Sequence, residues 1–351
     1  MSSIVASWAA PAANAPLVPH TISRREPGED DVRIEILYCG VCHSDIHQVR
    51  GEWGGSVFPM VPGHEILGRV TKVGTGVTKF KAGDIAGVGC FVDSCRECDP
   101  CRRGREQFCL AGTAFTYNST EMDRKTPTYG GYSAEVVVKE RYTLKIPSGL
   151  DLAAAAPLLC AGITTYSPLR EWKCAPGTRV GVVGLGGLGH MAVKIAAAMG
   201  AEVTMLSKSR SKEADARRLG AHAFELTSDT GAFKKLAGRF DLLIDTISVS
   251  HDLDAHLGLL RAEGAMVILG VPPTPATIGA MSVIFGNKKL AGSMIGGIAE
   301  TQEMLDFCAA KKITADVEVI PIGRINEAYE RMMKSDVRYR FVIDLASLGR
   351  G

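Results

Sequence analysis

A glycine-rich loop between a strand and a helix is the feature that most constrains the fold of this chain. Residues 184–189 read GLGGLG, directly after the apolar strand RVGVV and directly before the helical stretch GHMAVKIAAAMG. In this context G-x-G-x-x-G is a dinucleotide-binding signature, whose backbone turns tightly and approaches a pyrophosphate at the helix N-terminus. The alternative is a glycine turn that binds nothing. The candidate cofactor-binding residues are Gly184, Leu185, Gly186, Gly187, Leu188 and Gly189.

The pattern around this loop predicts two domains. From Thr178 onward, six apolar strand candidates (RVGVVG, EVTMLS, HAFEL, FDLLIDT, AMVILG and KLAGSM) alternate with helical stretches, which is typical of a parallel doubly wound sheet in an α/β fold. Up to about residue 150, short alternating segments broken by glycine and proline predict a small irregular β-barrel. The mixed tail is too short for its own core and is expected to complete the first domain. We therefore place one domain at 1–153 with 294–351 and the other at 154–293, starting in a helix predicted over LDLAAAAPLLCAGITTYSPLREW.

The end of the second strand of this sheet indicates which dinucleotide binds. An NAD site usually has Asp or Glu there, to bind the ribose hydroxyls. Here the residues read SKSRSK from 207 to 212, without a carboxylate. Hydroxyl groups and cations favour a 2′-phosphate, so we predict NADP(H), bound through Ser207, Ser209, Arg210 and Lys212. The alternative is that these residues only cap and solvate the start of a helix.

Four cysteines predict a metal-bound lobe. Cys95, Cys98, Cys101 and Cys109 form a C-x2-C-x2-C-x7-C pattern in a polar stretch, which suits one tetrahedral structural Zn²⁺. Arginines around them are expected to favour the charged thiolates. An iron–sulfur cluster or chance clustering are the alternatives. Disulfides do not fit, because the start MSSIVASWAAP lacks the basic and apolar regions of a secretory leader.

Composition excludes several classes of function. With 40 basic and 38 acidic residues, the chain has no electrostatic footprint for nucleic acid. No apolar run approaches about 18 residues, so no segment is expected to span a membrane. Ten cysteines without a leader indicate a reducing compartment, and we expect a cytoplasmic protein.

Three short polar islands each offer a further metal ligand. GVCHSDIHQ contains Cys42, PGHEILG contains His64, and PLLCAGITTY contains Cys160. Three protein ligands would leave a fourth position open for substrate, as in catalytic zinc sites. Spacing alone is poor support, because three separated residues can equally be core or surface.

With these motifs in order, the chain resembles the zinc-dependent medium-chain alcohol dehydrogenases over essentially its full length. GHE, the four-cysteine lobe, LCAGIT and GLGGLGH occur in the family's order. GVCHSD, TYGGYS, PLLCAGITTYSPLR, GSMIGG and YRFVID are similar to the cinnamyl-alcohol-dehydrogenase group, and closest to its bacterial NADPH-dependent broad-specificity aldehyde reductases. The resemblance implies a GroES-like barrel domain, a Rossmann domain and a homodimer.

The resemblance also implies roles for individual residues. Cys42, His64 and Cys160 would bind catalytic zinc, with Glu65 as an alternate ligand, and Asp45 would orient His64. Ser44 would donate to the substrate oxygen and His47 would pass the proton to solvent; alternatively, Ser44 caps a helix starting at Asp45 and His47 is merely exposed. The remaining positions are cofactor contacts at Thr164, Ser293 and Ile295, and a substrate pocket at Trp53, Cys90, Phe115 and Ile295.

The predicted activity is therefore interconversion of aromatic and aliphatic aldehydes with primary alcohols, by hydride transfer from or to NADP(H) with two zinc ions per chain. The small-molecule pocket is expected to have broad specificity, since an apolar wall discriminates by only about 1–3 kcal/mol per methylene. A zinc-free quinone reductase of the same superfamily is the nearer alternative. A zinc-lobe binding protein without catalysis is the more distant one.

Overall fold

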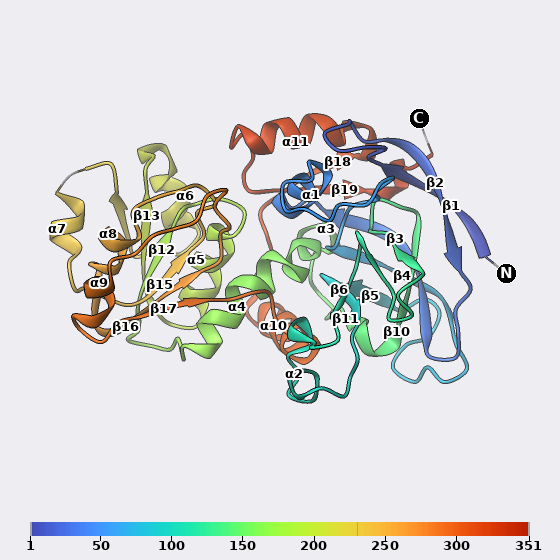
Figure 1. Cartoon of the computed structure of the whole chain (residues 1–351), viewed down its shortest axis with the longest axis horizontal. Helices are drawn as coiled ribbons and strands as arrows, with labels where there is room; N and C mark the ends of the chain where they lie inside the picture. The colour runs from blue at the N-terminus through green and yellow to red at the C-terminus, as the bar shows by residue number, and fades with distance from the viewer. Residues whose placement is uncertain (1, 230, 350–351) are drawn as a thin grey trace. The chain divides into compact units, whose positions relative to one another are not determined.

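The computed structural model describes residues 2–229 and 231–349, which fall into two compact units (Figure 1). The first unit comprises residues 1–160 and 296–351, and the second comprises residues 161–295. The domain boundaries expected from the sequence follow residues 153 and 293, which is seven and two residues before the limits of these units at 160 and 295. The division into domains stays a prediction. Each unit has its own sheet.

A seven-stranded mixed sheet forms the centre of the first unit. Its strands are β3 (Asp31–Gly40), β4 (Ile66–Val73), β5 (Ile85–Val88), β10 (Glu135–Lys139), β11 (Leu144–Lys145), β18 (Val317–Pro321) and β19 (Arg340–Asp344). The order is β11-β5-β4-β3-β19-β18, with β10 also paired to β3. The tail of the chain is thus part of this sheet, because β19 runs antiparallel to β3 and parallel to β18.

Smaller elements surround this sheet. The two-stranded pairs are β1 (Ser2–Ala9) with β2 (Val18–Arg25), β6 (Phe91–Asp93) with β7 (Ala114–Phe115), and β8 (Ser119–Thr120) with β9 (Pro127–Thr128). The α-helices are α1 (His43–Val49), α2 (Asp99–Arg102), α3 (Leu152–Ala155), α10 (Ile298–Lys311) and α11 (Ile325–Met333).

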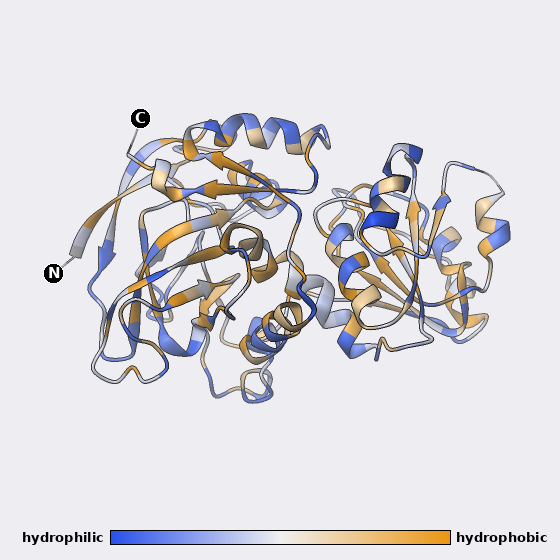
Figure 2. Cartoon of the chain, turned by 180° about the vertical axis from the view of Figure 1, so that it is seen from behind, coloured by the Kyte–Doolittle hydropathy of each residue, from blue (hydrophilic) through white to orange (hydrophobic). Residues whose placement is uncertain are grey.

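The second unit contains a parallel six-stranded sheet (Figure 1). Its strands are β12 (Arg179–Val183), β13 (Glu202–Ser207), β14 (Ala223–Leu226), β15 (Phe240–Asp245), β16 (Leu260–Ile268) and β17 (Lys289–Gly292). The order β14-β13-β12-β15-β16-β17 is that of a doubly wound dinucleotide-binding fold, whose crevice opens between β12 and β15. All six strands were predicted. Figure 2 shows them mostly orange, because strands covered on both faces are apolar throughout.

The helices of this unit are α4 (Ala161–Glu171), α5 (Gly189–Ala198), α6 (Glu213–Arg218), α7 (Ala232–Leu236), α8 (Leu253–Leu257) and α9 (Ala280–Ile284). Packing around fully buried Phe240 and Leu257 forms the core beside β15 and β16.

The single helix predicted over residues 150–172 is wrong. The chain forms α3, then a 3-10 turn over Ala156–Leu159, and starts α4 only after Cys160, whose φ of −131° is not helical. Pro157 lacks the N–H that a continuous helix would need at this point. No single helix among the described residues is long and apolar enough to cross a membrane; only the bent pair Leu152–Leu159 with Ala161–Glu171 reaches that length and composition together.

Candidate metal centres and dinucleotide site

The three polar islands converge on one buried cluster in the first unit. The ligand atoms of Cys42, His64, Glu65 and Cys160 all lie within 4.8 Å of one another, and all four residues are buried. Cys42 precedes α1, and the pair His64 and Glu65 precedes β4. Cys160 lies between the 3-10 turn and α4, where the predicted single helix is interrupted. This interruption places its thiol in the cluster.

The electrostatics of this cluster call for a cation. The hydrogen bond with Cys160 is the main effect that lowers the pKa of Cys42 well below its ordinary value, against the effect of burial. Burial raises the pKa of Glu65 to about 7, although the nearby Arg340 opposes this. His64 Nε2 and Glu65 Oε2 are buried without a hydrogen-bond partner. Such unpartnered acceptors are costly unless they bind a ligand.

The donor set fits Zn²⁺. Two thiols and an imidazole are ligands that zinc prefers, and three of them leave a coordination position open. Asp45 accepts hydrogen bonds from Cys42 N at 2.9 Å and Gly63 N at 3.2 Å, and its Oδ1 lies 3.5 Å from His64 Nδ1. With Nδ1 facing Asp45, the unpartnered Nε2 is the nitrogen left for a metal.

Ser44 and His47 both lie on α1. Ser44 Oγ is 3.6 Å from Cys42 Sγ. The alternative role for Ser44 as the cap of a helix starting at Asp45 is wrong, because α1 begins at His43 and Cys42 and Asp45 form its capping box. His47 is not merely exposed: Nδ1 pairs with Glu52, and its ring stacks on Trp53 at a centroid distance of 4.9 Å.

The residues expected to form the substrate pocket lie in both units. In the first unit, Trp53 is 44% exposed and Phe115, on β7, is 41% exposed. Cys90 Sγ lies 3.9 Å from the carbonyl oxygen of Leu159, one residue before Cys160. Ile295 ends the second unit, where it has a left-handed φ of 41°.

The second cluster is the predicted lobe. The thiols of Cys95, Cys98, Cys101 and Cys109 also lie within 4.8 Å of one another. This set of four sulfur ligands in a closed loop is suited to a structural Zn²⁺.

Backbone N–H groups donate to the sulfurs of Cys95, Cys98 and Cys109, whereas burial raises the pKa of Cys101 to about 12. Cys98 N donates to Cys95 Sγ at 3.4 Å, and the N–H groups of Cys98 and Glu97 are the main effects that lower the pKa of Cys95 to about 6. Arg96 instead pairs with Asp93 at 2.7 Å, and Arg103 with Asp99 at 3.1 Å. The expectation that arginines stabilise the charged sulfurs is therefore wrong for Arg96 and Arg103, because each pairs with a nearby carboxylate.

The glycine-rich loop joins β12 to α5 in the second unit. Gly184 has a φ of +90°, a backbone conformation that residues with a side chain rarely adopt. A Cβ on Gly189 would lie only 1.9 Å from Gly184 O. A Cβ on Gly186 would meet nothing within 4 Å, so the space in front of the loop is open. The first and third glycines are thus required by the backbone, and the second faces the space that a pyrophosphate would occupy.

The SKSRSK segment follows β13 beside this loop. Ser209 N donates to Ser207 Oγ at 3.2 Å, and the hydroxyls of Ser209 and Ser211 are 2.8 Å apart. Lys212 Nζ donates to Leu185 O at 2.6 Å. Ser209 and Lys212 precede the short helices here, but neither makes a side-chain capping hydrogen bond, so capping does not explain these residues.

Of the remaining cofactor candidates, Thr164 is buried on α4, whereas Ser293 follows β17 and donates its N–H to Ile268 O at 3.2 Å.

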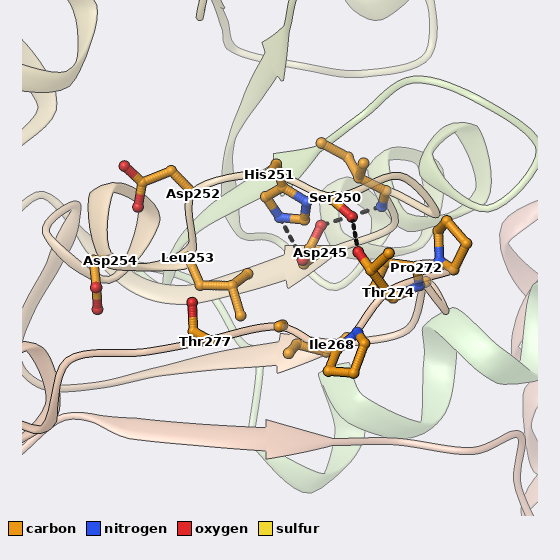
Figure 3. Close-up of a pocket in the computed structure, with 15 residues that line it drawn as sticks. Asp245, Ser250, His251, Asp252, Leu253, Asp254, Ile268, Pro272, Thr274 and Thr277 are labelled. Atoms are coloured by element: carbon orange, nitrogen blue, oxygen red, sulfur yellow. Dashed lines mark hydrogen bonds and ion pairs between the residues drawn. The ribbon is translucent and has the colours of Figure 1, made fainter.

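A cavity of about 880 Å³, which was not predicted from the sequence, opens at the carboxyl ends of β15 and β16 (Figure 3). On its wall, His251 Nε2 lies 3.0 Å from Asp245 Oδ2, and Nδ1 lies 2.9 Å from Val249 O. The nearby Asp245 carboxylate raises the pKa of His251. Ser250 and Thr274 also line the cavity, and their hydroxyl oxygens lie 2.5 Å apart. The sequence contains one indication of this cavity, because the apolar strand FDLLID ends in an acidic residue, Asp245.

Comparisons with known proteins agree with this geometry. Residues 28–148 match the alcohol dehydrogenase GroES-like domain, and residues 187–310 match the zinc-binding dehydrogenase domain. NADP-dependent alcohol dehydrogenase C 1 of Mycolicibacterium smegmatis is 58% identical over 99% of both chains. Aldehyde reductase YahK of Escherichia coli K12 is 53% identical over 96% of this chain and 97% of its own. The structure of a Sorghum bicolor cinnamyl alcohol dehydrogenase superposes with a TM-score of 0.95, at 47% identity over 98% of both chains.

Proposed function

Because the chain belongs to the zinc-binding, NADP-dependent alcohol dehydrogenases, we propose that Cys42, His64 and Cys160 hold its catalytic zinc, with Glu65 as an alternate ligand. The predicted family, fold class, enzyme class and cofactors are confirmed by these matches: the protein is an NADP(H)-dependent oxidoreductase that interconverts aldehydes and primary alcohols. The single observation that carries the ligand assignment is the convergence of two thiols and an unpartnered imidazole nitrogen from three separate segments.

The residues beside this cluster position and protonate the substrate. Zn²⁺ bound there would supply Lewis-acid polarisation of the substrate oxygen. Ser44, whose hydroxyl lies near Cys42, would donate a proton to that oxygen, and His47 would connect it to solvent. Asp45 would keep His64 in the tautomer with Nε2 free. The other cluster, Cys95, Cys98, Cys101 and Cys109, would hold the structural zinc.

NADP(H) binding would use the second unit. The dinucleotide supplies the hydride, and the chain positions it. The glycine-rich loop, residues 184–189, would take the pyrophosphate, and Ser207, Ser209, Arg210 and Lys212 the 2′-phosphate. Since the crevice of this fold lies at the switch point between β12 and β15, the cavity beyond β15 would receive the nicotinamide half. Thr164, Ser293 and Ile295 are further proposed cofactor contacts.

In the first unit, Trp53, Cys90 and Phe115 would contact the substrate, and Ile295 of the second unit is proposed separately as a further contact. Aromatic and aliphatic side chains discriminate weakly between apolar aldehydes, so the accepted range would be broad.

The partner would be a second copy of the chain, in the cytoplasm. Residues 271–285, next to the edge strand β17, expose Val271, Met281, Ile284 and Phe285 at 55–70% of their surfaces. Adjacent exposed apolar side chains at an unpaired sheet edge favour pairing with another subunit. Phe285→Asp should therefore shift the mass measured by light scattering from dimer to monomer, with Lys235→Asp on the same unit as a control. A dimer that persists in Phe285→Asp would contradict this surface.

The direct test is steady-state reduction of benzaldehyde and aliphatic aldehydes with NADPH, together with zinc counting. We expect turnover with about two zinc ions per chain. Quinone reduction without aldehyde turnover, with zinc only in the lobe, would favour the alternative of a quinone reductase that has no catalytic zinc. Zinc in the lobe without any NADPH turnover would favour a binding protein.

A further inference from the structure

Asp45 is held by hydrogen-bond donors from three segments. It is fully buried, and its carboxylate accepts from Cys42 N at 2.9 Å, Gly63 N at 3.2 Å and the Tyr132 hydroxyl at 3.2 Å. The first two donors are backbone groups next to metal-ligand positions. Tyr132 is different, because it lies between β9 and β10 and its segment contributes no ligand to the cluster.

Tyr132 is itself fixed in place. Its side chain is fully buried, and the Tyr329 hydroxyl of α11 donates to the Tyr132 hydroxyl at 3.5 Å. Its ring packs so closely on Gly63, the residue before His64, that a Cβ on Gly63 would lie 2.8 Å from Tyr132 Cδ1. A ring confined in this way presents its hydroxyl in one direction only.

Building on the proposed catalytic zinc, we infer that Tyr132 is a positioning residue for that metal: its hydroxyl orients Asp45, and Asp45 orients His64. Asp45 Oδ2 accepts from both Tyr132 and Cys42, while Oδ1 faces His64 Nδ1. Removing the hydroxyl takes one donor from Oδ2 and leaves the carboxylate to Cys42 N, Gly63 N and the Tyr117 hydroxyl, so it is held less firmly about its Cβ–Cγ bond. The imidazole then loses the partner that aims Nε2 at the metal, and the metal dissociates faster.

The lobe contains a matched arrangement around another tyrosine. The Tyr142 hydroxyl lies 2.7 Å from Ser94 Oγ, and Ser94 Oγ lies 3.2 Å from Cys101 Sγ. Tyr142 is also fully buried. Tyr132 and Tyr142 are thus both buried and both lie two contacts behind a metal ligand, so each serves as the control for the other.

The experiment measures zinc release. Zinc-loaded wild type, Tyr132→Phe and Tyr142→Phe are placed in excess chelator, and the zinc ions retained per chain are counted over time by native mass spectrometry. Direct partners of metal ligands typically change affinity about 10- to 100-fold, and Tyr132 acts one contact further away, so we expect release of one zinc to accelerate by about threefold to tenfold in Tyr132→Phe. The other zinc should dissociate at the wild-type rate, and Tyr142→Phe should show the reverse selectivity.

The same change in a Cys160→Ser background identifies which zinc is affected. Because that variant lacks a proposed catalytic ligand, Tyr132→Phe should no longer accelerate any release. Unchanged rates in Tyr132→Phe, equal acceleration of both zinc ions, or acceleration that persists with Cys160→Ser would each overturn the inference while leaving the proposed function intact. Only a wild-type chain that binds no zinc beyond the lobe would overturn both.

Discussion

Lys212 Nζ lies 2.6 Å from the carbonyl oxygen of Leu185, so the cation proposed for the 2′-phosphate also contacts the glycine-rich loop. The two functions predict different kinetics. A residue that binds the 2′-phosphate affects NADPH alone, whereas a residue that only holds the loop affects both dinucleotides through their shared pyrophosphate.

We expect Lys212→Ala to lower kcat/KM for NADPH by about tenfold to a hundredfold, the loss of one or two charge-assisted contacts at about 1.4 kcal/mol per factor of ten. The value for NADH should change little. Steady-state kinetics with both dinucleotides measure this, with Lys235→Ala as the control because Lys235 pairs with Glu225 away from the loop. An equal loss with NADH and NADPH would instead assign Lys212 to the loop alone.

Removing a ligand from one metal cluster should have different effects on stability and activity than removing a ligand from the other. Cys101→Ser should lose the lobe zinc and lower the melting temperature, because structural metal binding contributes folding free energy. Cys160→Ser should lose the other zinc and nearly all activity, with a melting temperature closer to that of wild type. Zinc content, thermal unfolding and aldehyde turnover measured on the same samples check both. Normal turnover by Cys160→Ser at one zinc per chain would refute the proposed ligand set.

The pair of His251 and Asp245 predicts a pH dependence of stability. The nearby Asp245 carboxylate raises the pKa of His251 above 6.5, although burial and the cation Lys208 oppose this. A raised pKa means that the folded state binds the proton more tightly, so the stabilisation is complete below about 6.5 and is lost as pH rises through the folded pKa.

Compared with His251→Gln, the wild type should therefore have its greatest advantage in unfolding free energy below about pH 6.5 and lose it as the pH rises through the raised pKa of His251. Urea unfolding of the dinucleotide-free protein across that range provides the values. An advantage that stays constant or grows with pH would contradict a protonated His251.

The sequence predicted what is local and missed what depends on distant chain segments. The four lobe cysteines lie within fifteen residues, so their spacing alone suggested a shared metal. The glycine loop and six apolar strands were likewise readable from short-range patterns. The ion pair of Glu65 with Arg340 was not, because it joins residues 275 positions apart and requires β19 to pair with β3.

The break that presents Cys160 was missed for a different reason. Alanine and leucine on both sides favour a helix, and they outweighed Pro157, the one residue in the sequence that indicates a break before Cys160. The cavity at Asp245 and His251 also forms from two loops whose proximity follows from strand order and not from either sequence.

The proton path from Ser44 to His47 is the last prediction. The alkoxide produced by hydride transfer to an aldehyde must gain a proton, and a positioned donor typically contributes about 10²–10⁴-fold. Ser44→Ala should therefore lose most of that factor in kcat/KM with zinc content unchanged. His47 pairs with Glu52 and stacks on Trp53, so it has other partners, and His47→Gln should cost less because water can replace its function. Ser56→Ala is a matched control, since the Ser56 hydroxyl donates to Gln48 O at 2.7 Å instead of facing the cluster. Because α1 is capped by Cys42 and Asp45, a lost helix cap cannot explain a defect in Ser44→Ala, and wild-type rates in that variant at full zinc occupancy would mean that Ser44 donates no proton.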